Sequence, residues 1–370
     1  MRIGFDAKRA FSNFSGLGNY SRIAIESLAQ YYPEELFFLF APDLLISNFE
    51  SIQFRKNIEL ISSNTFSKSF WRSYSQVNDW NKNKLNLFHG LSNELPFGLN
   101  RTETKKVVTI HDVIFKKHPD FYSFANRSVY DFKTKYACKN ADRIICVSEQ
   151  TKNDVIKYYK VPEKKLAVIY TALPAHITRM ISSDKISEVK NKYQLPEKYI
   201  LHVGTIEKRK NLLTVVKAMN HLKSSGMALV VVGKPTEYLN EIIKYTASQT
   251  NPTTILFIHY ASNENLNVIY SQAHAFIYTS INEGFGIPLI EAGAHGVPAI
   301  TSRNSCMQEA SGNGALYVNP TNIDETAEAI SSLFNNEKLR KELSAMALAH
   351  SSKFNSKNLA TELMNLYKSV

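Results

Sequence analysis

The chain has 370 residues, of which 44% are hydrophobic and 21% are charged. This composition is globular, and the length favours two domains whose cores are large enough to need no disulfides or metal ions. Three cysteines without a CxxC pair argue against a disulfide framework and a structural zinc site. No apolar run approaches the roughly 20 residues of a membrane span. The first residues resemble a strand rather than a signal peptide, so we expect a cytoplasmic protein.

The formal net charge is +11, and the first half is the more basic. Residues 1–173 carry a net charge of about +8, and the rest carry about +3. A basic first half fits an anionic partner such as a membrane surface, a phosphorylated ligand or a nucleic acid. A lysine-rich soluble surface explains the same charge without a partner. Nucleic acid fits least, because the basic residues are not interleaved with aromatic residues and no nucleic-acid motif is present.

In residues 1–173, short β-like runs alternate with longer amphipathic runs. Strands that alternate with helices form a mostly parallel sheet with helices on both faces, so this pattern predicts an α/β, Rossmann-like domain. The expected strands are 2–7, 36–42, 85–90, 105–112 and 143–148. The expected helices include 19–32, 127–141 and 149–159.

The pattern weakens near residues 170–185 and then starts again. The second series has expected strands at 199–205, 227–234, 254–260 and 275–280, and an expected helix at 211–223. Two last helices, about 336–349 and 357–368, could pack back across the first half. We therefore expect one domain at 1–173 with the return of about 357–370, and a second at 174–356. Ligands bind at the carboxyl ends of parallel strands, and the polar motifs described below all lie at such ends.

Residues 281–302, INEGFGIPLIEAGAHGVPAITS, place two glutamates around a tight apolar stretch. A loop follows the strand that ends near Ser280, and Pro288 suits the first turn of the helix that follows. Gly284 and Gly286 allow backbone N–H groups to approach a ligand closely.

The carboxylates of this stretch suit two ends of one ligand. Glu291, expected in the first turn or so of the helix, can accept hydrogen bonds from a vicinal diol such as a ribose. Glu283 lies in the loop, nearer the far end of the ligand. Alternatively, Glu291 only caps the helix electrostatically and Glu283 is an ordinary loop carboxylate.

A second motif, VGTIEKRKNL at 203–212, combines a glycine turn with cations. Gly204 ends a strand, and Arg209, Lys210 and Asn211 are expected to open a helix. Cations at a helix N-terminus would neutralise a diphosphate. The alternative is a solvated cluster of charges.

Two motifs in the first half carry weaker signals. Gly16 and Gly18, in SGLGNYSR at 15–22, predict a glycine turn at the end of the first strand, although any tight turn fits such a pair. His111 ends the strand in VVTIHDVIF and is either structural or a hydrogen-bond partner of a sugar hydroxyl or a developing charge. His89 is expected to have a packing role.

The stretch EGFGIPLIEA, with carboxylates eight residues apart, resembles the E-x7-E motif of retaining nucleotide-sugar glycosyltransferases of family GT4. Residues 266–320 are similar to that family throughout. The resemblance implies the GT-B fold, in which two Rossmann-like domains face each other across a cleft and the C-terminal helix packs back on the first domain. It also implies that the first domain binds the acceptor and the second binds the nucleotide sugar.

The resemblance implies a role for each candidate residue of the second domain. Glu291 binds the ribose hydroxyls of the donor. Glu283 lies by the donor sugar, and so do the amides of Gly284, Phe285 and Gly286.

The remaining candidates are matched in the same way. The loop with Thr205, Arg209 and Lys210 binds phosphate, although many relatives carry an arginine where this chain has Thr205. His111 lies against the donor sugar, and Gly16 and Gly18 lie beside the donor phosphate and the acceptor.

These residues suggest a retaining glycosyltransferase of bacterial cell-surface polysaccharide synthesis. It would move a hexose, with mannose from GDP-mannose as the first choice, from a nucleotide-diphosphate sugar to a glycan or lipid-diphosphate-linked glycan. Arg209 and Lys210 would stabilise the leaving diphosphate, and Glu283 would position the donor, with His111 opposite. The alternatives are a UDP-sugar-dependent transferase, a sugar-nucleotide epimerase or phosphorylase, and a non-catalytic nucleotide-sugar binder.

The sequence contains no D-x-D pair, no H-E-x-x-H and no Cys/His cluster, so we expect neither a metal nor a cofactor. The nucleotide sugar is then a substrate. The basic first half suits peripheral contact with an anionic membrane at its inner face.

Overall fold

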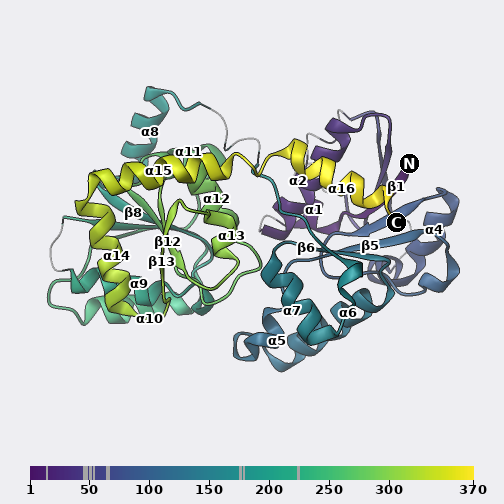
Figure 1. The fold of residues 1–370 in the computed structure, drawn as a ribbon, viewed down its shortest axis with the longest axis horizontal. Coiled ribbons are helices and arrows are strands. Elements are labelled where there is room, and N and C mark those ends of the chain that lie inside the picture. The colour runs from purple at the N-terminus through teal and green to yellow at the C-terminus, as the bar shows by residue number, and fades with distance from the viewer. Residues whose placement is uncertain are drawn as a thin grey trace. The chain divides into compact units, whose positions relative to one another are not determined.

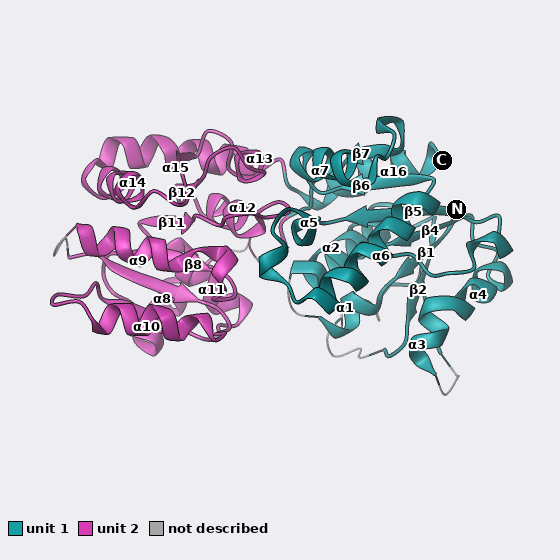
Figure 2. Ribbon diagram, turned by 90° about the horizontal axis from the view of Figure 1, so that it is seen from below, with its two compact units in different colours: residues 1–172, 354–370 teal, residues 173–353 magenta. Residues whose placement is uncertain are grey.

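The structure, a computed structural model, describes residues 1–13, 16–44, 49, 52, 55–63, 67–174, 177, 180–222 and 226–370. The chain divides into two compact units, which Figure 2 colours separately. Unit 1 contains Met1–Ala172 and Phe354–Val370, and unit 2 contains Leu173–Lys353. None of the described helices is long and apolar enough to cross a bilayer.

Within the described residues of unit 1, seven strands form one sheet in the order β3-β2-β1-β4-β5-β6-β7. Each described pair of neighbours is parallel. From the central β1 the chain first adds strands on one side and then, from β4 onward, on the other. The strands are β1 (Arg2–Asp6), β2 (Leu36–Ala41), β3 (Ile58–Ser62), β4 (Leu87–Gly90), β5 (Lys105–Ile110), β6 (Arg143–Cys146) and β7 (Leu166–Val168).

Helices cover both faces of this sheet (Figure 1). On one face α16 packs against α2, and α1 packs beside them. On the other face α4, α6 and α7 contribute to a single apolar cluster with the strands. The helices are α1 (Lys8–Ser12), α2 (Gly16–Tyr31), α3 (Lys68–Phe70), α4 (Gln76–Lys82), α5 (Ile114–Lys117), α6 (Phe124–Asn140), α7 (Glu149–Tyr159) and α16 (Ser356–Lys368).

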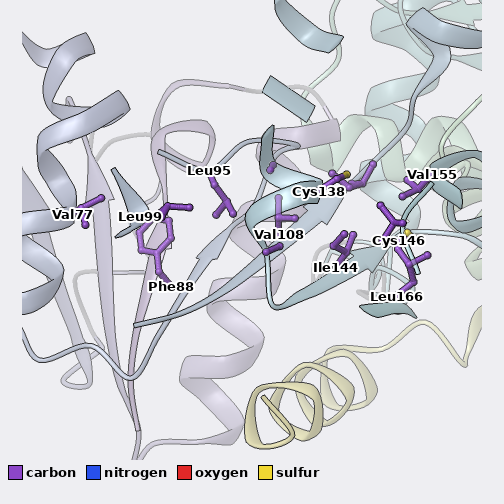
Figure 3. Close-up of a cluster of buried hydrophobic side chains, with 14 of the residues drawn as sticks. Val77, Phe88, Leu95, Leu99, Val108, Cys138, Ile144, Cys146, Val155 and Leu166 are labelled. Carbon is purple, nitrogen blue, oxygen red and sulfur yellow. The ribbon is translucent and has the colours of Figure 1, made fainter. Parts of the chain in front are cut away.

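Figure 3 shows this cluster, in which Val108 and Ile144 of the strands meet side chains of the covering helices. Cys138 and Cys146 are buried in it as free thiols. Burial raises the pKa of Cys138 to about 12, so the thiol stays neutral and acts as a small apolar group.

A chain of buried hydrogen bonds fastens α16 to the sheet of unit 1. His89 on β4 bonds through Nδ1 to the Tyr367 hydroxyl at 2.7 Å and through Nε2 to Thr109 Oγ1 at 2.8 Å. The Tyr20 hydroxyl of α2 lies 3.1 Å from the same Thr109 oxygen. Burial lowers the pKa of His89 to about 3, so the ring is neutral. His89 therefore has the packing role expected from the sequence.

Six strands, counted over the described residues of unit 2, form a parallel sheet in the order β10-β9-β8-β11-β12-β13. They are β8 (Tyr199–Val203), β9 (Ala228–Val232), β10 (Ile255–Ile258), β11 (Ala275–Tyr278), β12 (Ala299–Ser302) and β13 (Ala315–Val318). The helices are α8 (Ser183–Tyr193), α9 (Leu212–His221), α10 (Tyr238–Ala247), α11 (Asn263–Ser271), α12 (Ile287–Ala294), α13 (Met307–Ser311), α14 (Ile323–Asn335) and α15 (Glu337–Ser351). Figure 1 shows helices on both faces of this sheet as well.

Four strands were not among those expected from the sequence: β3, β7, β12 and β13. They have only three to five residues each, and β3 and β7 are edge strands with one neighbour. So short a run leaves little periodicity to detect. The expected helix at 211–223 ends at a residue outside the described ones.

Of the two C-terminal helices that could pack back across the first half, α15 does not do so. This helix packs against α12 of unit 2, and α16 alone joins unit 1.

We expect Tyr367→Phe to destabilise the protein by about 1–3 kcal/mol, because it leaves a buried nitrogen of His89 without its partner. The shift of the denaturant unfolding midpoint measures this loss. Tyr31→Phe, an exposed position on α2, is the matched control and should leave the midpoint unchanged. Equal midpoints for the two variants would contradict the fastening role of Tyr367.

Candidate active site

The strand order of unit 2 creates a switch point between β8 and β11. These two strands are paired, and the chain proceeds outward from β8 on one side and outward from β11 on the other. Loops that leave neighbouring strands in opposite directions open a crevice at their carboxyl ends, which is where open parallel sheets bind ligands. Arg209 and Glu283 lie in these two loops, so the topology brings them together.

The loop after β8 begins at a strained glycine. Gly204 has φ +149°, a backbone conformation that favours glycine. At the neighbouring Gly233 only glycine fits, because a Cβ there would lie 1.9 Å from the Gly204 carbonyl oxygen. Thr205 follows and is exposed. Arg209 and Lys210 then lie in a 3₁₀ turn, Lys208–Lys210.

The expectation that Arg209, Lys210 and Asn211 open a helix is wrong, because α9 begins only at Leu212. Asn211 adopts a left-handed conformation with φ +58°. Its side-chain amide donates to the carbonyl oxygens of Thr279 at 3.2 Å and of Pro320 at 2.6 Å. These bonds tie the turn to the loops after β11 and β13 and hold the two cations ahead of the helix.

The loop after β11 brings Glu283 inward and then enters α12. Phe285 is buried, and Gly286 has φ +124° and serves as the N-cap of α12. The Cys306 thiol lies 3.1 Å from the Glu283 carbonyl oxygen. Pro288 lies in the first turn of α12, as expected from the sequence.

Glu283 and two cations form a buried ion cluster. Glu283 Oε1 lies 2.6 Å from Lys210 Nζ, and Oε2 lies 2.6 Å from Arg209 Nη1. Glu283 is only 9% exposed and Lys210 8%. The Arg209 guanidinium also pairs with Glu207 and donates to the Asn282 carbonyl oxygen at 2.9 Å.

The electrostatics of this cluster keep Glu283 ionised. Burial acts to raise its pKa, but the charges of Lys210 and Arg209 outweigh burial and lower the pKa to about 2. Burial lowers the pKa of Lys210, and Glu283 opposes that shift. Both carboxylate oxygens of Glu283 are occupied by cations, so the group is suited to holding charge in place rather than to transferring a proton.

Glu291 has a different environment. It is the fifth residue of α12, at the start of the second turn and close to the helix N-terminus, because the helix begins at Ile287. Its Oε2 accepts a hydrogen bond from the Tyr270 hydroxyl at 2.9 Å. Burial raises the pKa of Glu291 to about 7, and the bond from Tyr270 only partly opposes this shift. The carboxyl therefore titrates near neutral pH.

Sequence reasoning missed two tyrosines that complete these carboxylate sites. Tyr278, the last residue of β11, lies 3.2 Å from Glu283 Oε1 through its hydroxyl, and Lys210 Nζ hydrogen-bonds the same hydroxyl. Tyr278 is the last residue of an apolar strand that directly precedes the loop with Glu283, so the sequence could have indicated it. Tyr270 precedes Glu291 by a whole strand and loop, and no local signal connects the two.

In unit 1, His111 follows β5 and is half-buried. Its Nε2–H donates to the Leu91 carbonyl oxygen at 2.8 Å, which leaves Nδ1 as the acceptor nitrogen of the ring. Burial lowers the pKa of His111 to about 4, so the ring is neutral. The Tyr20 ring contacts it edge-on, with centroids 4.7 Å apart. His111 lines a cavity of about 260 Å³ in this unit.

The expected glycine turn at Gly16 and Gly18 is wrong. The short helix α1 follows the first strand, and both glycines lie in the first turn of α2, which begins at Gly16. Ser15 of the motif lies outside the described residues. A Cβ on Gly18 would lie 1.8 Å from the Asn13 carbonyl oxygen, whereas one on Gly16 would meet nothing within 4 Å. Gly18 is therefore required for packing, and Gly16 is not.

We expect Glu291→Gln to stabilise the free protein above pH 7. The folded-state pKa of about 7 lies above the ordinary 4.5, so stability is lost as pH rises from 4.5 to 7. Glutamine removes this penalty, which is about 3–4 kcal/mol, and still bonds Tyr270. Thermal unfolding at pH 5 and pH 8 tests this, since the gain should appear mainly at pH 8.

Glu283→Gln is the matched control and should behave in the opposite way. Its folded-state pKa is lowered, so the carboxylate contributes stability above about pH 4.5 that is lost as pH falls toward 2. Removing this charge leaves the buried Lys210 without a carboxylate and Arg209 with Glu207 alone, at a cost of about 3–5 kcal/mol. The assignment of the two environments fails if both substitutions shift stability in the same direction at pH 8.

We expect Gly18→Ala to destabilise the protein by about 1–3 kcal/mol or more, because its methyl group meets backbone. Gly16→Ala should change stability by less than about 0.5 kcal/mol. Denaturant unfolding of the two variants side by side is the measurement. A tolerated Gly18→Ala would contradict the close approach of α1 and α2.

Two family models match this chain. Residues 42–175 match Glycosyltransferase Family 4, and residues 183–349 match Glycosyl transferases group 1. The first match falls in unit 1 apart from its last three residues, and the second falls within unit 2.

Among curated relatives, the O-antigen chain mannosyltransferase RfbU of Salmonella typhimurium is 32% identical over 241 residues, which cover 62% of this chain and 64% of that protein. The match thus spans less than two thirds of RfbU. The O-antigen chain mannosyltransferase B of Escherichia coli is 26% identical over 287 residues, which cover 76% of this chain and 74% of that protein.

Among solved structures, Anabaena Alr3699/HepE in complex with UDP-glucose superimposes with a TM-score of 0.78 at 16% identity, over 100% of both chains. This likeness concerns the fold. Because the two family models together match most of both units, the chain belongs to the group 1 (family 4) glycosyltransferases and has the GT-B fold.

Proposed function

We propose that the protein is a retaining glycosyltransferase of bacterial cell-surface polysaccharide synthesis. It transfers a hexose, with mannose as the first choice, from a nucleotide-diphosphate sugar to a glycan or lipid-linked glycan. The observation that carries this proposal is the buried cluster of Glu283, Arg209 and Lys210 at the switch point of unit 2.

The main chemical task is to stabilise a leaving nucleoside diphosphate. Transfer breaks the bond between the anomeric carbon and the diphosphate, so negative charge develops on the phosphate oxygens while the sugar acquires oxocarbenium character. Arg209 and Lys210 are the cations that meet this charge. Their hydrogen bonds to Glu283 fix them in advance, so little reorganisation is needed in the transition state.

Glu283 acts in this scheme as an ionised positioning group by the donor sugar. Its two oxygens hold cations, which argues against attack on the anomeric carbon. The acceptor hydroxyl attacks from the face that the diphosphate leaves, and a phosphate oxygen takes its proton. This sequence retains the anomeric configuration and requires no metal.

The other candidate residues bind the two substrates. Glu291 accepts hydrogen bonds from the ribose hydroxyls, a contact that favours its ionised form. The backbone of Gly284, Phe285 and Gly286, together with Thr205, borders the donor.

In this proposal unit 1 binds the acceptor. His111 is neutral near pH 7 and lies against the donor sugar, where its Nδ1 accepts a hydrogen bond from a sugar hydroxyl. Gly16 and Gly18, at the start of α2, lie beside the donor phosphate and the acceptor.

The donor is assigned by likeness. Two O-antigen mannosyltransferases are among the relatives, which supports GDP-mannose, whereas HepE was solved with UDP-glucose, which supports a UDP-sugar as the second choice. A sugar-nucleotide epimerase or a non-catalytic binder is a more distant alternative, because Arg209, Lys210 and Glu283 are all present. We place the protein in the cytoplasm, in peripheral contact with the inner face of the membrane.

We expect Lys210→Met to lower turnover by about 10²-fold or more, because one of the two cations facing the diphosphate is lost. Lys208→Met is the matched control: Lys208 lies in the same turn but is exposed and pairs with Glu241. It should retain normal turnover. Near-normal rates for Lys210→Met, with folding checked by circular dichroism, would remove Lys210 from the mechanism.

A donor panel tests the function itself. Thermal shifts with GDP, UDP, ADP and dTDP identify the base. The matching nucleotide sugars are then incubated with and without lipid-linked and soluble glycan acceptors, in EDTA and in added magnesium. Acceptor-dependent transfer that survives EDTA is expected. Strict metal dependence would contradict the metal-free mechanism, and nucleotide binding without transfer to any acceptor would favour a binder.

A further inference from the structure

Helix α6 of unit 1 exposes an apolar face to solvent. Phe124 is 75% exposed, Phe132 62% and Val129 51%. Phe124 and Phe132 are eight residues apart, so they lie on one side of the helix. The opposite side, with Ala137 and Cys138, is buried in the core. Large apolar side chains that gather on one helix at 51–75% exposure form a patch that no described residue covers.

The exposed aromatic surface extends beyond α6. The Phe97 ring lies 6.0 Å from the Phe132 ring and 4.7 Å from the Tyr136 ring. The Phe97 backbone amide donates to the Ser73 carbonyl oxygen at 2.7 Å. The neighbouring Tyr74 is 41% exposed and Phe70 59%. Phe97 thus connects the aromatic side chains of α6 with those beside α3.

Basic residues lie on the same face. Lys135 and Lys139 are exposed, and three or four residues separate each from the next along the line Phe132, Lys135, Lys139. The Arg127 guanidinium lies over the Phe124 ring at 5.4 Å. Within α6 the one acid is Asp131, which pairs with Lys116 of α5. The exposed face of α6 is therefore mainly apolar in its N-terminal half and cationic in its C-terminal half.

We propose that this exposed face of α6 binds an anionic membrane surface. Aromatic rings are stable at the boundary between headgroups and acyl chains, and lysines are attracted to anionic headgroups. The charge favours lipid over a second copy of the chain, because two such faces would bring like charges together. Among the described helices, α6 alone carries two exposed phenylalanines, and the short α3 carries one, Phe70.

Helix α6 also connects this surface with the cavity of unit 1. The residues Tyr130, Lys133 and Thr134 on another side of α6 line the cavity that also contains His111. A protein bound through α6 would hold that cavity beside the bilayer, where a lipid-linked acceptor is located. This last step rests on the proposed function, which also places the protein at the membrane, whereas the exposed face of α6 is observed independently of it.

Vesicle co-sedimentation tests the proposal with the full-length chain. Vesicles of phosphatidylcholine alone are compared with vesicles of phosphatidylcholine and phosphatidylglycerol in equal amounts, at low and high salt. The wild type should pellet with the anionic vesicles. Phe124→Ser/Phe132→Ser should weaken this binding by about tenfold or more, and Lys135→Glu/Lys139→Glu by about 20-fold, with less effect at high salt.

Matched controls come from unit 2. Ile243→Ser/Tyr260→Ser removes apolar side chains that are 51% and 80% exposed, and Lys338→Glu/Lys341→Glu reverses two exposed charges on α15. Both should bind vesicles as the wild type does. The proposal is overturned if the α6 variants bind like these controls, or if the wild type binds phosphatidylcholine equally well.

Light scattering without vesicles addresses the second copy. If the wild type is a dimer and the α6 variants are monomers, the membrane proposal is overturned in favour of a protein interface. A monomeric wild type supports the membrane proposal. Thermal shifts with nucleotide diphosphates should be the same for α6 variants and wild type. A failure of nucleotide binding would therefore count against the proposed function and leave the membrane surface untouched.

Discussion

A carboxylate held between two buried cations is the interaction on which the site in unit 2 depends. Glu283 could not remain ionised at 9% exposure without Lys210 and Arg209, and these cations could not be buried without Glu283. The three charges meet because the loops after β8 and β11 leave adjacent strands at a switch point. Asn211 strengthens this arrangement by joining both loops to the end of β13. The result is a pair of cations held in fixed positions, which is suited to meeting a diphosphate.

The two glutamates of one motif have opposite electrostatics, although only eight residues separate them. Cations lower the pKa of Glu283 to about 2, and burial beside Tyr270 raises that of Glu291 to about 7. Environments that shift the pKa values of two carboxyl groups in opposite directions suit the two groups to different tasks. Glu283 suits permanent charge, whereas Glu291 pays a desolvation penalty that a ligand with hydroxyl groups can relieve.

Unit 1 presents a different kind of surface. Its centre is fixed by buried bonds between His89, Thr109 and Tyr367, which fasten the last helix of the chain to the sheet. Its outer helix α6 has exposed phenylalanines and lysines on one side and lines the cavity of His111 on another. This outer face is the surface that we propose binds an anionic membrane.

Sequence periodicity determined the parallel α/β architecture and most of its strands, because strands and helices of ordinary length have distinct apolar repeats. Motif chemistry likewise singled out Glu283, Glu291, Arg209 and Lys210. Local pattern failed where short elements decide: α1 and the first turn of α2 replaced a glycine turn. The tertiary structure alone decided which charges meet, since Tyr270 reaches Glu291 only through packing between α11 and α12. Sequence records residue types and spacing, whereas burial and pairing, which set the pKa of each carboxyl group, arise only when distant segments pack together.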